Sequence, residues 1–96
     1  MIEAFEEKDP DSTVPRWFDW RDYCTAFGGN LVEYVLEIEN APDASLVISD
    51  DAREGNVVSF WISGGTLDAT YTIRCRVSLS NGITDDWSKT QTISQR

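Results

Sequence analysis

The segment from Thr70 to Ser80 constrains the fold more than any other part of the sequence. Its apolar residues occupy every second position and polar residues fill the positions between them. Strict alternation is typical of a half-buried β-strand, because successive side chains of a strand point to opposite faces. The pair Asn81-Gly82 follows directly and indicates a β-hairpin. We expect Tyr71, Ile73, Cys75 and Val77 to point inward, and Arg74 and Arg76 to point outward.

The same period recurs along most of the chain. Residues 17–20 predict a first strand with Phe18 and Trp20 in the core and Trp17 on the outer face. Three further strands are expected. One covers 31–39, with Val32, Tyr34, Leu36 and Ile38 on one face. The second covers 57–63, where Val58, Phe60 and Ile62 oppose Val57 and Trp61, and the third covers 84–94, where Trp87 and Ile93 share a face. Residues 21–29 are expected to form a loop, and residues 50–56 a polar turn.

Six or seven such strands with no helix pattern predict an all-β protein. The expected fold is an immunoglobulin-like antiparallel β-sandwich of about seven strands, for which about 100 residues suffice. The chain has 96 residues, so its length fits one such domain. A five-stranded barrel is the main alternative.

The first fifteen residues differ from the rest of the chain. They are mostly polar, include Pro10 and Pro15, and show no sustained period. We expect residues 1–15 to form an extended N-terminal arm, mobile in the isolated protein, and residues 16–96 to form the sandwich. The apolar Ile2 and Phe5 near the tip suggest that this arm docks on a neighbour in an assembly.

Charge and composition exclude several partners. A formal net charge of −9 argues against direct contact with nucleic acid or with anionic membranes. No stretch reaches the length of a membrane span, and the acidic N-terminus does not resemble a secretory signal. Synthesis in a cytoplasm is therefore expected, with Cys24 and Cys75 free and buried.

Nothing in the sequence predicts catalysis, a cofactor or a metal. The chain has no histidine, so neither a Ser-His-Asp nor a Cys-His arrangement can form. The two cysteines lack the spacing of a zinc site. The acidic groups Asp50-Asp51 and Asp85-Asp86 are interpreted as surface turns. We expect a protein that is not an enzyme and has no cofactor.

The four tryptophans are the most informative residues for function. Trp17, Trp20, Trp61 and Trp87 are hard to bury completely in so small a domain. Tryptophan is enriched in protein interfaces because it combines a large contact area with a polar group. We expect one or two of these side chains to face a partner.

Two groups of motifs carry a resemblance to a known family. One is the string Phe60-Trp61-Ile62-Ser63-Gly64-Gly65-Thr66 with the strand Thr70 to Val77 and the turn Ser80 to Asp86; the other is the opening Glu7-Lys8-Asp9-Pro10-Asp11 with Phe18-Asp19-Trp20. Together they resemble the phage fibre–tail adaptors, which are short immunoglobulin-like virion proteins.

The resemblance implies a structural protein of the phage particle, made in the host cytoplasm and present in several copies. Its partners would be other virion proteins, namely a tail, neck or portal-proximal protein and a fibre or spike. A capsid decoration protein and a carbohydrate-binding module for host recognition are the alternatives. The predicted partner-binding residues are Ile2, Phe5, Glu7 and Asp9 in the arm, and Trp17, Trp20 and Trp87 in the sandwich.

Overall fold

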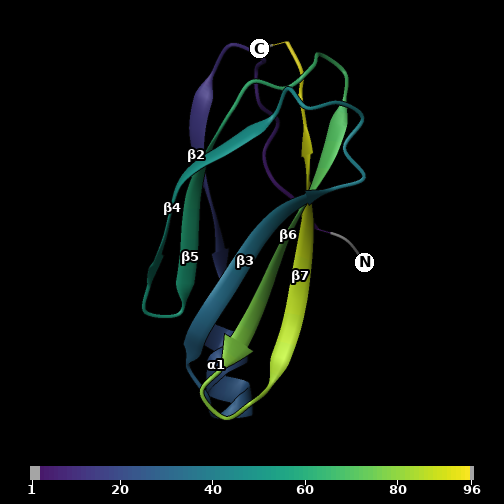
Figure 1. The fold of residues 1–96 in the computed structure, drawn as a ribbon. Helices are drawn as coiled ribbons and strands as arrows, with labels where there is room; N and C mark the ends of the chain where they lie inside the picture. The colour runs from purple at the N-terminus through teal and green to yellow at the C-terminus, as the bar shows by residue number, and fades with distance from the viewer. Residues whose placement is uncertain (1–2, 96) are drawn as a thin grey trace.

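Seven β-strands and one short helix form the computed structural model, which describes residues 3–95 (Figure 1). The strands are β1 (Glu3–Ala4), β2 (Thr13–Asp19), β3 (Leu31–Glu39), β4 (Val47–Glu54), β5 (Val57–Ser63), β6 (Thr70–Leu79) and β7 (Thr84–Thr92), and the helix is α1 (Arg21–Phe27). One sheet has the strand order β1-β7-β6-β3 and the other has the order β2-β5-β4. The strands are paired antiparallel except for the parallel pair β1 and β7. The expected immunoglobulin-like sandwich is confirmed, with two separate sheets in place of a barrel.

The core lies between the central strands of the two sheets. The four residues of β6 that were predicted to point inward are each at most 1% exposed, and Arg76 is exposed on the outer face. Val58, Phe60 and Ile62 of β5 meet them from the opposite sheet and are equally buried. Burial raises the pKa of the Cys75 thiol to about 11 and raises that of Cys24 as well. Both cysteines are therefore buried thiols of low reactivity.

Tyr71 fixes the corner where the chain passes from β5 to β6. Its hydroxyl accepts a hydrogen bond from the Thr66 backbone N–H at 3.0 Å and donates one to Asp43 Oδ1 at 2.7 Å. This arrangement resembles the tyrosine corner of immunoglobulin-like domains, in which the hydroxyl bonds back to the chain before the strand. Asp43 also accepts hydrogen bonds from Ser45 and Thr66, so it joins the loop before β4 to this corner.

Strand β3 contains a bulge that the alternation of its sequence does not reveal. The register with β6 shifts between Leu31 and Glu33. A bulge adds one residue to one strand and reverses which side chains point inward. Leu31 is therefore buried and Val32 is 51% exposed, so the prediction that Val32 lies inside is wrong. Beyond the bulge, Tyr34, Leu36 and Ile38 pack against the core as expected.

The segment expected to be a loop after β2 contains the helix α1. A helix of seven residues is too short to show a periodic pattern, and it is stable only through tertiary contacts. Those contacts come from Cys24, which is buried, and from Trp20, whose backbone N–H donates to Asn56 O at 2.9 Å. The helix ends at Gly28, whose φ of 75° is the left-handed conformation that glycine favours. In Figure 1, α1 closes the end of the sandwich that also holds the β6–β7 hairpin.

The polar turn expected at residues 50–56 is also shorter than predicted. Strand β4 continues to Glu54, and only Gly55 and Asn56 connect it to β5. A register shift between Ser49 and Ala52, with Asp50 at a φ of 51°, allows the acidic residues to stay within the strand. The hairpin predicted from Asn81-Gly82 is present between β6 and β7.

Residues 3–9 lie along the sandwich. Strand β1 pairs with β7 through Glu3↔Lys89 and Ala4↔Thr90, and Lys8 forms a further bridge with Ile93. The segment stays in place because it completes the edge of β7 and covers apolar surface with Phe5. In addition, β2 begins at Thr13, so part of the predicted arm belongs to a strand.

Candidate partner-binding surface

The outer face of the β2-β5-β4 sheet is uncharged over its middle. The strand register aligns the outward residues in three adjacent rows across the sheet: Thr13, Ser63 and Val47; Pro15, Trp61 and Ser49; Trp17, Ser59 and Ala52. No residue in these rows carries a charge, although 26% of the chain is charged. The next outward row holds Asp19, Val57 and Glu54, and Asp50 and Asp51 lie in the irregularity of the edge strand β4, so charges border the three rows. Trp17 is 55% exposed, Trp61 43% and Val47 51%. We call these nine residues the uncharged face.

The two tryptophans are diagonal neighbours on adjacent strands of this face. Trp17 lies opposite Ser59, and Trp61 lies opposite Pro15, so the indole rings are offset by one row. Diagonal neighbours of this kind are about 7–8 Å apart, within reach of aromatic side chains. Large exposed aromatic groups are typical of the centre of protein interfaces, and charged residues next to Trp17, such as Asp19 and Lys89, would lie at the rim.

A seam between β2 and β7 holds the N-terminal segment. The carbonyl oxygen of Glu6 accepts hydrogen bonds from Arg16 Nη2 at 2.9 Å and from Gln91 Nε2 at 2.7 Å. Arg16 Nε also donates to Gln91 Oε1 at 2.9 Å, which ties β2 to β7. Lys8 is 1% exposed, and its ammonium donates to the carbonyls of Gly64 and Asp9. These contacts satisfy polar groups that burial would otherwise leave without partners.

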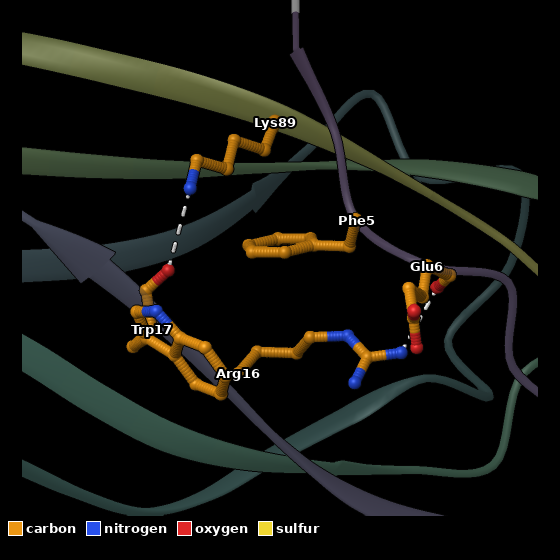
Figure 2. Close-up of a pocket in the computed structure, with 5 residues that line it drawn as sticks. All are labelled: Phe5, Glu6, Arg16, Trp17 and Lys89. Atoms are coloured by element: carbon orange, nitrogen blue, oxygen red, sulfur yellow. Dashed lines mark hydrogen bonds between the residues drawn. The ribbon is translucent and has the colours of Figure 1, made fainter.

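Phe5 inserts its ring into this seam. The ring packs edge-on against Phe18, with centroids 5.6 Å apart, and against Phe60, with centroids 6.1 Å apart. Figure 2 shows it projecting from the N-terminal segment into the space between Lys89 of β7 and Arg16 of β2. Aromatic pairs in such geometry add to the stability that burial alone gives. The Phe5 ring is therefore packed against the sandwich of its own chain in this structure.

Lys89 is held against aromatic rings. Its Nζ lies 4.5 Å from the ring centroid of Trp87 and 5.1 Å from those of Phe5 and Phe18. Its hydrogen bond to the carbonyl oxygen of Trp17 is long, at 3.5 Å. Burial lowers the pKa of this ammonium. The ring faces stabilise its charge through cation–π contacts.

A cavity of about 350 Å³ opens beside this cluster. It is lined by Phe5, Glu6, Arg16, Trp17 and Lys89 (Figure 2). Two of these residues are cationic, in a chain with only eight lysines and arginines. Trp17 also belongs to the uncharged face, so the cavity and that face form one continuous surface.

The predicted partner-binding residues differ in how exposed they are in the structure. Trp17 is exposed as expected, whereas Trp20 is 2% exposed and belongs to the core, so it is not available to a partner. Trp87 is half-buried, with its ring edge-on to those of Trp20 and Phe18. Glu7 is exposed on the docked segment, Asp9 is half-buried in the turn that follows, and Ile2 lies outside the described residues.

Two residues of this surface are absent from the seven predicted partner-binding residues. Trp61 was considered only as one of the four tryptophans, although alternation along β5 places it opposite the buried Phe60 and Ile62 and therefore outward. Lys89 gave no comparable signal, since its role depends on the docking of Phe5 from the other end of the chain.

Within residues 3–95, no group of three or more acidic or cysteine residues is arranged to hold a metal ion. No helix in the described part of the chain is long and apolar enough to cross a membrane.

Comparison with known proteins gives one finding. A family model described as "Podophage GP4 fiber-tail adaptor protein gp77" matches residues 8–91. Comparison with curated proteins finds no significant match. The matched region begins at the buried Lys8 and ends within β7, so it contains every residue of the uncharged face.

Proposed function

Because the chain belongs to the podophage fibre–tail adaptor family, we propose that it attaches a fibre to the tail by binding one of these two components through its uncharged face. The role of this family is structural, and its place is in the phage particle. Two virion proteins are therefore the expected partners.

The carrying observation is the exposure of Trp17 and Trp61 within three adjacent rows of the sheet that hold no charged residue. Exposed tryptophans of this size favour burial, and a neighbouring charge would oppose it by losing its hydration. Serine hydroxyls on either side of Trp61, from Ser59 and Ser63, can hydrogen-bond across an interface. The face is thus suited to a flat, apolar partner surface with a few polar groups.

The experiment is a reconstitution with phage particles assembled without this chain. Purified full-length chain is added, and the concentration that restores half of the fibre attachment is measured. A Trp17→Ser substitution should raise this concentration by about 30-fold or more, since truncating a central interface tryptophan costs about 2 kcal/mol or more.

The matched control is Val35→Ser on the other sheet. Val35 is also 55% exposed, and it lies on the outer face of β3. This variant should reconstitute like the wild type. Equal attachment by both variants would contradict the proposal. Binding of the chain to capsids or to glycans, with unchanged fibre attachment, would favour a decoration protein or a carbohydrate-binding module instead.

A further inference from the structure

We infer that the cavity beside Phe5 receives an aspartate or glutamate side chain of the virion protein that docks on the uncharged face. This inference rests on the proposed function, because that docked protein would bring the acidic side chain to the cavity. It also differs from what net charge alone suggests, since a chain of −9 would be expected to bind basic groups.

The ammonium of Lys89 carries the inference, because Arg16 already donates hydrogen bonds to Glu6, Pro15 and Gln91. Lys89 and Arg16 approach the cavity from β7 and β2, on either side of Phe5 (Figure 2). The ammonium of Lys89 has three N–H donors, and the hydrogen bond to Trp17 O uses one of them at 3.5 Å. Among residues 3–95, no carboxylate lies within 4.0 Å of this ammonium. A carboxylate from outside would complete its hydrogen bonding.

The surroundings of Lys89 would strengthen such a contact. The ring faces of Phe5, Phe18 and Trp87 hold the ammonium in one position and limit its access to water. A charge-assisted hydrogen bond in a water-poor site is stronger than one on an open surface. Part of the dehydration of Lys89 has already occurred in the free protein, so less remains to be lost on binding.

The position of the cavity identifies which partner would supply the acid. Trp17 lines the cavity and is also the most exposed aromatic residue of the uncharged face. A protein that covers Trp17 must therefore pass the cavity mouth. Glu6 also lines the cavity, but it is fixed there through its backbone carbonyl, which Arg16 and Gln91 hold.

The test uses the same reconstitution with three substitutions at Lys89. Lys89→Met keeps a flexible apolar side chain against the rings and removes the charge, so the fold should be retained. We expect it to raise the half-maximal concentration by about 30-fold or more, the effect of losing one side of a close charge pair. Lys89→Arg should recover most of the loss, and Lys89→Glu should abolish attachment.

The control is Arg76→Met, which removes one positive charge from the exposed outer face of β6. It should reconstitute like the wild type. Thermal unfolding of each variant tests whether the fold is retained. If Lys89→Met matches the wild type at every salt concentration while Trp17→Ser still fails, the cavity receives no carboxylate and the proposed function stands. If Trp17→Ser also succeeds, the proposed function itself is wrong.

Suppressor selection gives a second, independent measurement. Phage that carry Lys89→Glu are grown until plaque formation returns. We expect suppressors that replace an aspartate or glutamate of another virion protein by a neutral or basic residue. Suppressors found only at Glu3 or Glu6 of this chain would overturn the inference, because the cavity would then serve only its own N-terminal segment.

Discussion

The two outer faces of the sandwich have the same strand architecture but opposite side-chain chemistry. On the β3-β6-β7 face, rows in register combine Val35 with Arg76 and Asp86, and Glu37 with Arg74 and Ser88. Glu33 and Glu39 lie in the two flanking rows, so each of these four rows carries at least one charge. On the other sheet, the three rows of the uncharged face carry tryptophan, valine, proline, alanine and small hydroxyl residues, and only the fourth row, with Asp19 and Glu54, is charged.

This difference between the two outer faces cannot be explained by solubility alone. Both faces contact water in the isolated chain, so solubility alone would place charges on both of them. In our proposal, the uncharged face is the one that becomes covered, because interface centres are depleted of charged residues and enriched in aromatic ones. The charged face is then the surface that stays in solvent in the particle.

The largest expected effect comes from placing a charge on the uncharged face. A Ser59→Lys substitution would bury an ammonium beside Trp17 at a cost of several kcal/mol, which Asp19 and Glu54 in the next row would offset only in part. The half-maximal concentration for reconstitution should rise by more than about 100-fold. Thr84→Lys places the same charge on the other face and should have no effect. Equal loss in both variants would remove the distinction between the faces.

A core substitution between the two faces should affect stability and leave binding intact. Val77 is 1% exposed and points toward β5. Val77→Ala should lower the free energy of unfolding by about 1–3 kcal/mol, through lost burial and a remaining cavity. Urea unfolding measures this change. The folded fraction should still reconstitute at the wild-type concentration; weaker binding would mean that the face depends on core packing.

The ion pairs of the charged face should contribute little to stability. Arg74 pairs with Glu37 and lies 3.3 Å from Glu39 through its Nε, without hydrogen-bond geometry in the latter contact. These side chains remain partly in solvent, where ion pairs are worth less than about 1 kcal/mol. Arg74→Met should therefore change the free energy of unfolding by less than this in urea titrations. A larger loss would show that the charged face holds the sheet together.

The smallest effect should appear only in acid. Hydrogen bonds from Ser45 and Thr66, and from Tyr71, hold the pKa of Asp43 well below its usual range. Because the folded pKa is the lower one, this carboxylate stabilises the fold above its unfolded pKa of about 3.9, and the contribution is lost as pH falls below that value. Asp43→Asn should flatten the decline of stability below about pH 4. An unchanged slope in acid titrations would show that the corner does not depend on this charge.

The parts of the fold that follow a local period could be predicted from the sequence. The alternation in β6 placed Tyr71, Ile73 and Cys75 inside, and the structure confirms all three. Phe18 and Trp20 were placed correctly by the same reasoning. A period of two is a property of neighbouring residues, so it can be read without knowing the tertiary structure.

The features that the sequence did not reveal depend on distant contacts. The bulge near Val32 and the docking of Phe5 are both decided by partners on other strands. The cavity lining is likewise assembled from β2, β7 and the N-terminal segment. Trp17 was predicted to face a partner from its outward position, and that prediction remains to be tested, as does the separation of residues 1–15 as an arm.

Cysteine labelling of assembled particles tests the central claim most directly. Single substitutions Ser59→Cys and Thr84→Cys place a thiol on each outer face, while Cys24 and Cys75 are buried and have raised pKa values. Both variants should react with a maleimide at similar rates in the isolated chain. In intact particles, we predict that the thiol at position 59 is protected and the thiol at position 84 still reacts. Equal reaction of both thiols in particles would contradict the claim that the uncharged face is the one covered on assembly.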